Sequence, residues 1–237
     1  MSDNAPGPAQ TRPRQIRKKP AARIEEILRV AAEVFVDLGY AGFNLREVAS
    51  RVGVRLNAVQ YYFPAREKLL DATLERVVTA WISEFRSIAD DHVQPPERRL
   101  EALFDLNLRL LVAPQTAPLM FEVFAMAQHE AFAKELVRRN YNIYRGIFED
   151  ILREVAPACP NDRIVATAAL ITSQMEGLVL FLRPGDPTAP TPQSVRDRFG
   201  PLAALYVKMI REQPRSAVGR SRHANLSRAP QPNVRVE

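Results

Sequence analysis

Cysteine and histidine are scarce in this chain of 237 residues, which contains one cysteine, Cys159, and three histidines. A single cysteine excludes an intramolecular disulfide framework and any zinc cluster built from several cysteines. The histidines lie far apart in the sequence, without the spacing of metal ligands: His92, His129 and His223. We therefore expect neither a bound metal nor a cofactor.

Long apolar runs are also absent. Gly177–Leu182 is among the longest, and it is far shorter than the roughly 18–20 residues that span a bilayer. The N-terminal segment is polar and basic, and it lacks the apolar core of a secretory signal. We therefore expect a cytoplasmic protein that has no membrane partner.

Positive charge is concentrated at the two ends of the chain. The net charge is +6, and residues 1–20 and 213–237 each carry five basic residues and one acidic residue. Each end thus contributes +4, which leaves a slightly acidic body between them. Basic ends suit a polyanion such as nucleic acid, and solubilising disordered ends are the alternative.

Apolar residues recur at the spacing of an α-helix along most of the chain, and prolines lie mainly between the periodic segments. The first such helix begins near Ile24 and ends at Gly39. Asn44, followed by Glu47 three residues later, forms a capping-box pattern at the start of a short second helix. Gly53 then allows a tight turn before a third short helix.

Further helices are predicted over residues 66–89, from Pro95-Pro96 onward, from Thr116 to Ala127, over 130–155, and from 161, capped by Asn161, to 182. We expect a proline-rich loop over 184–193 and a last helix, interrupted at Gly200-Pro201, that ends near Arg211. No strand alternation occurs. The fold class is therefore all-α.

The segment 21–70 has the order of a helix-turn-helix unit, in which the second short helix can enter the major groove of DNA. We divide the chain into a disordered basic arm (1–20), a helix-turn-helix domain (21–70), a helical regulatory and dimerisation domain (71–212), and a disordered basic tail (213–237).

The identities and spacing of the following residues form a pattern across this segment: Arg23, Ile27, Leu28, Ala31, Phe35, Gly39, Tyr40, Gly42, Phe43, Val48, Ala49, Gly53, Val54, Tyr61, Tyr62, Phe63, Arg66, Glu67 and Leu69. This pattern closely resembles the TetR-type (tetracycline-repressor-like) family of regulators. The resemblance implies an N-terminal DNA-binding head and a variable helical domain that binds a ligand and forms a dimer.

Three positions depart from the family pattern. Arg55 stands where Ser or Thr usually opens the recognition helix, which removes a good N-cap. Gln60 replaces a common Tyr, and Arg66 replaces the usual Lys. These changes leave the operator sequence open.

The resemblance and the positions together assign candidate DNA contacts. Asn44, Tyr61, Tyr62 and Arg66 are expected to contact phosphates, as is the basic N-terminal arm. The candidates for reading bases are Arg46, Arg55, Leu56, Asn57 and Gln60. For Tyr62 the alternative is a place in the core, and for Leu56 it is simple exposure.

The regulatory helices are rich in aromatic residues and methionine. The resemblance implies a ligand cavity among them, while ordinary core packing is the alternative for each side chain. The candidates are Trp81, Phe85, Phe104, Phe124, His129, Tyr144, Met175 and Glu176. His129 and Glu176 are polar, so each orients the ligand or else faces solvent.

A heptad stripe over residues 161–182 favours dimerisation. It comprises Ile164, Ala168, Ile171, Met175, Leu178 and Leu182, and a second stripe comprises Leu202, Leu205, Tyr206 and Met209. Two such helices from each subunit can form a four-helix interface. The alternative is that both stripes face the core of their own chain.

Together these features predict a ligand-responsive transcriptional regulator. We expect a homodimeric repressor that leaves a palindromic operator when a small, mostly apolar effector binds. One alternative is a DNA-binding regulator controlled by a protein partner. The other is an all-α enzyme, but the sequence has no catalytic constellation that supports it.

Overall fold

The computed structural model describes residues 20–182 and 187–212, and its regular structure over these ranges is helical. The all-α fold class is thereby confirmed. The disorder expected for the two basic ends lies outside the described residues. The elements are α1 (Pro20–Gly42), α2 (Leu45–Val52), α3 (Leu56–Tyr62), α4 (Arg66–Ala89), α5 (Pro96–Leu111), α6 (Thr116–Met126), α7 (Ala131–Val155), α8 (Asn161–Gly177), the 3-10 turn η1 (Leu178–Leu180), α9 (Pro192–Arg196) and α10 (Phe199–Arg211).

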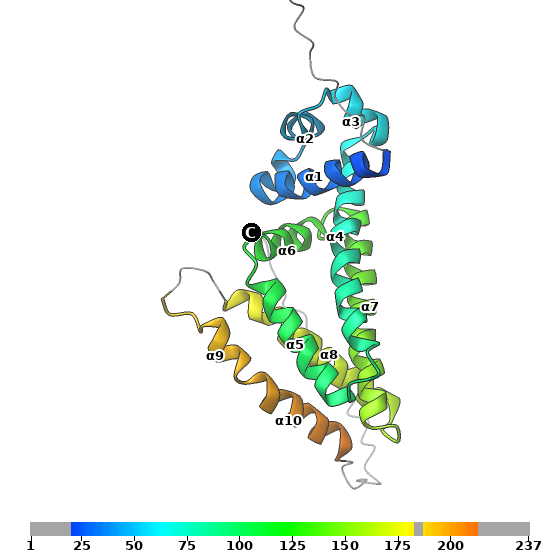
Figure 1. Ribbon diagram of the computed structural model, residues 1–237, viewed down its shortest axis with the longest axis vertical. Coiled ribbons are helices and arrows are strands. Elements are labelled where there is room, and N and C mark those ends of the chain that lie inside the picture. The colour runs from blue at the N-terminus through cyan, green and yellow to red at the C-terminus, as the bar shows by residue number, and fades with distance from the viewer. Residues whose placement is uncertain (1–19, 183–186, 213–237) are drawn as a thin grey trace, which may run out of the picture.

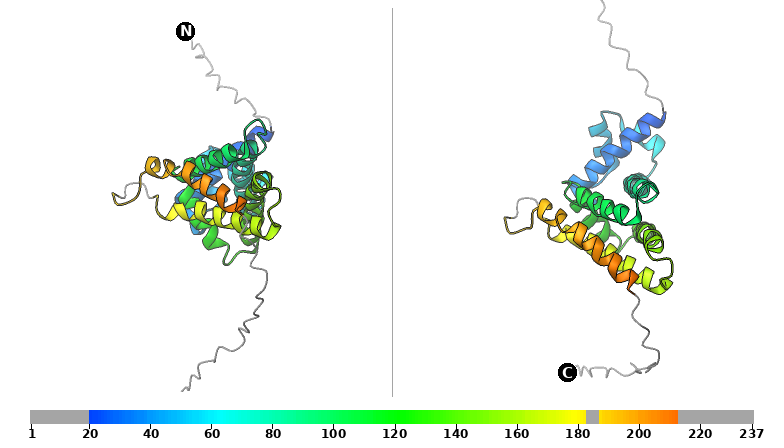
Figure 2. Two further views of the ribbon diagram at one scale, coloured as in Figure 1. Left: turned by 90° about the horizontal axis from the view of Figure 1, so that it is seen from below. Right: turned by 60° about the horizontal axis from the view of Figure 1, so that its bottom comes forward.

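Helices α1 to α3 form a head at one end of the elongated molecule (Figure 1). The long helices α4 and α7 run side by side away from it, and α6 lies directly below α1. At the far end α10 lies along α5 and α8, as both views in Figure 2 show. The head is therefore joined to the rest of the molecule through α4 and α6.

Two main cores hold this arrangement together. The head core, which includes Phe35, Val48 and Val59, continues into Leu119 of α6 and Leu136 of α7. In the second core, α5, α7, α8 and α10 pack against one another around buried aromatic side chains that belong to the apolar stripes of the sequence. Each fully buried large apolar side chain stabilises the fold by about 1.5–3 kcal/mol.

The turns of the head form where the sequence predicts them. Gly39 has a φ of 65° and interrupts the regular helix, after which the chain makes one more short turn. Gly53 has a φ of 75° at the end of α2, a conformation that strains any residue with a Cβ atom. The sharp α2–α3 turn therefore depends on this glycine.

Some predicted boundaries are wrong. Pro160 occupies the N-cap position of α8, and Asn161 instead accepts a hydrogen bond from Arg153. The expected loop contains the start of α9, which Thr191 caps. The break before the last helix precedes Phe199, and Gly200-Pro201 lies in its first turn, where a proline removes no helical hydrogen bond.

The heptad stripe of α8 is part of the chain's own core. Ile164, Ala168, Ile171 and Met175 are at most 2% exposed and pack against α5, α7 and α10. By length and hydropathy alone, residues 161–180 also fit a membrane span, contrary to our expectation that no segment would. The buried stripe shows that α8 is a core helix here.

Candidate nucleic-acid interface and internal cavity

The start of α2 is fixed by Asn44. Its Oδ1 accepts a hydrogen bond from the main-chain N–H of Glu47 over 2.9 Å, and its Nδ2 donates to the oxygen of Gly42. The predicted N-cap by Asn44 therefore forms, while the Glu47 carboxylate pairs with Arg51 instead of completing a capping box.

The outer surface of α3 is polar and exposed. Val59 packs into the head core, while Asn57, Gln60 and Tyr61 face solvent, Tyr61 being 82% exposed. Arg55 at the N-cap position makes no side-chain cap hydrogen bond, as its replacement of Ser or Thr predicts. One short helix thus presents an amide pair and a phenol to the outside.

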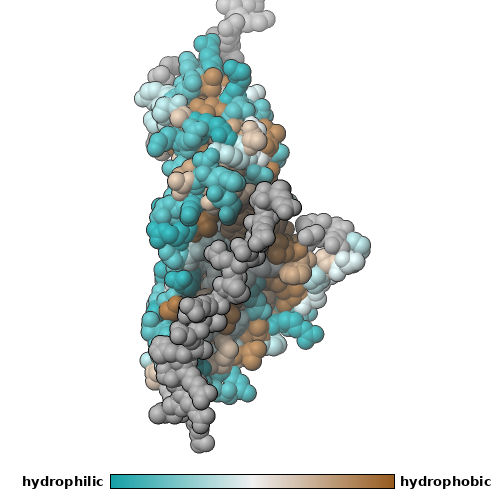
Figure 3. Space-filling view, turned by 180° about the vertical axis from the view of Figure 1, so that it is seen from behind, coloured by the Kyte–Doolittle hydropathy of each residue, from teal (hydrophilic) through white to brown (hydrophobic). Residues whose placement is uncertain are grey.

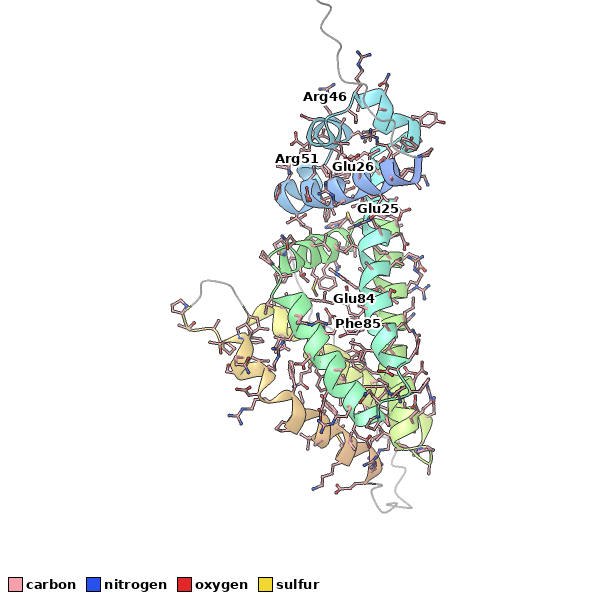
Figure 4. All side chains as sticks on the ribbon, in the orientation of Figure 1. Glu25, Glu26, Arg46, Arg51, Glu84 and Phe85 are labelled. Atoms are coloured by element: carbon pink, nitrogen blue, oxygen red, sulfur yellow. The ribbon has the colours of Figure 1, made fainter. Side chains whose placement is uncertain are left out.

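A shallow groove between α2 and α3 brings together several predicted DNA contacts. It is lined by side chains that include Asn44, Arg46, Leu56 and Gln60. Arg46 lies on α2 at the top of the head, away from the regulatory helices (Figure 4). Tyr62 is half-buried against the core, and its ring meets that of Tyr61 edge to face, with centroids 5.0 Å apart.

Arg66 makes internal contacts that the sequence did not predict. Its Nε donates to the main-chain oxygen of Phe43 over 2.8 Å, and another guanidinium nitrogen donates to that of Tyr40. The guanidinium also lies over the Tyr40 ring, 4.3 Å from its centroid. These contacts join α4 to the end of α1, and the expected phosphate contact of Arg66 stays a prediction.

An internal cavity of about 80 Å³ lies between α4, α5, α6, α7 and α8. Five of the eight predicted ligand residues line it, and they come from four different helices: Trp81, Phe85, Phe124, Tyr144 and Glu176. Phe85 is labelled on α4 in Figure 4. The lining is mostly apolar, with a few polar groups.

The other three predicted ligand residues lie elsewhere. The ring of Phe104 contacts those of Phe148, Phe199 and Tyr206, so it belongs to the far core. Met175 is completely buried in the same core. His129 is exposed in the turn between α6 and α7. Periodicity alone could not distinguish the helix faces that separate these side chains from the cavity.

Sequence reasoning missed four polar residues of the cavity, Asn107, Thr116, Asn140 and Tyr141, and two of them form hydrogen bonds with predicted residues. Asn107 is 4% exposed and donates through Nδ2 to the hydroxyl of Tyr144 over 3.0 Å, while its Oδ1 is buried without a partner. Tyr141 donates to Glu176 over 2.7 Å. The signal for Asn107 was an asparagine between two leucines, Leu106 and Leu108, which are both buried.

Burial changes the acidity of these groups. It is the main cause that raises the pKa of Glu176, partly opposed by the hydrogen bond from Tyr141. Burial also raises the pKa of Tyr141 and of Tyr144, and the nearby carboxyl of Glu176 adds to both effects. Both phenols therefore remain protonated hydrogen-bonding groups at neutral pH.

Helix α6 connects this cavity with the head. Phe124 lies in the cavity wall, while Glu122 on the same helix accepts a hydrogen bond from the main-chain N–H of Tyr40 over 2.9 Å. The hydroxyl of Tyr40 donates to Glu130 over 2.7 Å, a contact that raises the pKa of Tyr40. A displacement of α6 would therefore be felt directly at the end of α1.

Family comparisons agree with both halves of this architecture. Residues 27–73 match the model of the bacterial regulatory proteins of the tetR family, and residues 96–199 match the C-terminal model of BetI-type transcriptional repressors. The chain belongs to the TetR family. The helix-turn-helix head and the helical second domain are the two parts of that fold.

Two relatives of this TetR-family chain show how far the sequence similarity extends. The regulator RutR of Escherichia coli (strain K12) is 30% identical over 71 residues, which are 30% of this chain and 34% of RutR. The regulator BetI of Rhizobium meliloti (strain 1021) is 27% identical over 159 residues, 67% of this chain and 76% of BetI. The match to RutR thus spans about a third of its length.

A solved structure supports the fold of this TetR-family chain as a whole. A transcriptional regulator from Rhodococcus sp. Rha1 superposes with a TM-score of 0.66 at 21% identity. The match covers 81% of this chain and 99% of that one. The similarity therefore extends beyond the head to the helical domain.

The TetR-family chain also carries exposed apolar side chains on its far half. They lie on α8, on the turn after it and on α10: Leu170, Phe181, Leu205 and Met209. Hydrophobic surface gathers below the head in the view from behind (Figure 3). Within residues 20–182 and 187–212, no three His, Cys, Asp or Glu side chains are grouped to hold a metal ion.

Proposed function

We propose that this protein is a DNA-binding transcriptional repressor that a small effector releases from its operator. The observation that carries the proposal is the head, in which a short helix with an exposed polar surface follows a tight glycine turn. This is the arrangement by which helix-turn-helix proteins place a recognition helix in the major groove. The protein acts by binding, in the cytoplasm with its DNA, and not by catalysis.

The exposed side chains of the head divide by chemistry. Asn57 and Gln60 carry amides, which can pair with adenine, and Arg55 carries a guanidinium, which can pair with guanine. Tyr61 can contact a phosphate, and Arg46, which lines the groove between α2 and α3, can read a base. Leu56 borders the same groove and can meet a thymine methyl group.

Helix α6 lines the cavity and also contacts the head, so it can couple effector binding to release from DNA. An effector in the cavity contacts one side of α6, and the other side holds Tyr40 through Glu122. Binding that favours a shifted α6 would change the position of the head, and such coupling is typically worth about 1–3 kcal/mol.

The protein works as a homodimer in this proposal. The buried α8 stripe is not available for pairing, so we place the interface on exposed apolar side chains of α8, of the turn after η1 and of α10. These are Leu170, Phe181, Leu205 and Met209. A two-fold dimer presents two copies of α3 and reads a palindrome.

Binding to the DNA beside its own gene tests this function. The full chain is titrated against duplexes from that region, and fluorescence anisotropy reports binding. Gln60→Ala should lower affinity for the preferred duplex by about 1–3 kcal/mol and relax preference at one base pair per half-site. Gln128→Ala, an exposed glutamine outside the head, is the matched control. Equal effects of the two changes would exclude α3 as the recognition helix.

A further inference from the structure

The polar groups of the internal cavity are few, and none of them is cationic. Among the described residues that line it, the polar ones are Asn107, Thr116, Asn140, Tyr141, Tyr144 and Glu176, with no lysine, arginine or histidine. The remaining lining is aromatic and aliphatic. The chemistry of these groups limits what the cavity can hold.

Asn107 and Tyr144 form one hydrogen bond with each other, and each keeps a further hydrogen-bonding group without a partner among the described residues. Their one mutual hydrogen bond leaves the Oδ1 of Asn107 as a buried acceptor without a partner and the Tyr144 O–H as a donor. Turning the amide over exchanges these roles, but the pair still offers one donor and one acceptor. A buried acceptor without a partner destabilises the structure, so a ligand that donates to it is favoured.

Glu176 of α8 also lines the cavity, near Tyr144, and makes the cavity unfavourable for anions. Its carboxyl accepts a hydrogen bond from Tyr141. Burial raises its pKa, which shows that its surroundings already disfavour negative charge. A ligand carboxylate would bring a second negative charge into the same apolar space with no cation to balance it.

We propose that the effector of this cavity is a largely apolar molecule that carries an O–H or N–H donor and no negative charge. The proposal rests on the effector-released regulator described above. Asn107 accepts from the donor of the ligand, and the Tyr144 hydroxyl donates to an acceptor beside it. Glu176 excludes carboxylates.

A matched ligand panel tests this class. The panel combines each of two skeletons, cyclohexylmethyl and decyl, with each of four groups: a hydroxyl, a primary amide, an ammonium and a carboxylate. Calorimetry with the full chain measures the affinity for each compound. On at least one skeleton, a donor-bearing uncharged or cationic ligand should bind at least about tenfold more tightly than the carboxylate. Carboxylates that bind as well as the others, or a panel in which nothing binds, would overturn the proposal.

Two variants assign the effect to residues. Glu176→Gln keeps an acceptor for Tyr141 and removes the charge, so carboxylate affinity should rise by about tenfold while alcohol affinity stays within about threefold. Asp162→Asn removes a similar charge from an exposed position at the start of α8 and should change neither. Unchanged carboxylate discrimination in Glu176→Gln would remove Glu176 from the proposal.

Asn107→Leu keeps the number and branching of the side-chain heavy atoms and removes the acceptor. Alcohol affinity should fall by about tenfold, while the affinity for the parent hydrocarbon, methylcyclohexane or decane, should be kept and shows that the cavity is intact. Equal loss for alcohol and hydrocarbon would contradict the assignment to Asn107.

The same titrations in the presence of operator DNA distinguish failure of the proposed ligand class from failure of the proposed regulator function. If carboxylates bind and release DNA, the proposed ligand class is wrong but the regulator function stands. If the chain binds no DNA yet prefers the donor-bearing ligands, the cavity chemistry stands and the proposed function fails.

Discussion

Tyr40 connects the DNA-facing head with the rest of the molecule. Its main-chain N–H and its hydroxyl donate to two carboxylates, Glu122 and Glu130, and its ring and main-chain oxygen receive Arg66. These partners come from α6, from the residue before α7, and from α4. Tyr40, near the end of α1, therefore contacts three other parts of the fold.

We predict that the Tyr40–Glu130 hydrogen bond contributes about 0.5–1.5 kcal/mol to stability. Tyr40→Phe and Glu130→Ala should each lower the free energy of unfolding, and the double variant should lose less than the sum of the two. Urea unfolding of the four proteins measures this coupling. Strict additivity would mean that the contact contributes nothing.

Glu176 should make stability depend on pH. Burial raises its pKa above the ordinary value of 4.5, so the folded chain keeps this proton to a higher pH than the unfolded chain. The free energy of unfolding therefore falls as the pH rises from about 4.5 through the raised pKa. Glu176→Gln should gain stability over the parent, and the gain should be larger at about pH 8 than at about pH 4.5.

Urea unfolding at the two pH values measures this difference, with Asp162→Asn as the control. Asp162 is exposed, so this variant measures the effect of removing a carboxylate from the surface. A Glu176→Gln advantage that does not change with pH would contradict a raised pKa in the folded chain.

At the residue scale, the sequence predicted local interactions of a side chain better than its position in the fold. The cap on α2 followed from Asn44 and its spacing to Glu47, because capping depends on local geometry. The internal role of Arg66 and the position of Phe104 did not follow. Both depend on contacts with residues far away along the chain, which periodicity does not specify.

At the element scale, α8 shows how a regular pattern can be assigned to the wrong surface. Its heptad stripe is apolar enough for an interface, but α5, α7 and α10 cover it. The exposed apolar residue Leu170 lies outside that stripe. Spacing predicts that one face of a helix is buried, and only the tertiary arrangement decides whether the same chain or a second chain buries it.

The two surfaces of α8 should respond differently to substitution. Met175→Ala leaves a cavity in the core and should lower the free energy of unfolding by about 2–5 kcal/mol. Leu170→Glu combined with Leu205→Glu should leave circular dichroism unchanged and convert dimers into monomers with weaker operator binding. Sedimentation of the variant and the parent measures the change. A parent that sediments as a monomer at micromolar concentration would exclude the dimer.

At the scale of the whole molecule, the order of helices and the division into head and helical domain could be predicted from the sequence. Prolines and glycines mark the ends of the helices, and the head pattern occupies consecutive residues. The cavity was predicted only in part, because its wall combines residues from five helices that are distant in sequence. The unpaired Oδ1 of Asn107 could not be predicted, because it depends on how α5 packs against the neighbouring helices.

Selection from random duplex DNA tests the central claim most directly. The full chain is mixed with a random-sequence library, and the bound duplexes are sequenced. We predict one enriched palindrome, with half-sites about one helical turn, or about 34–36 Å, apart. Asn57→Ala together with Gln60→Ala should weaken that enrichment at fixed positions within each half-site. No enriched sequence, or an asymmetric site read by a single head, would contradict the account.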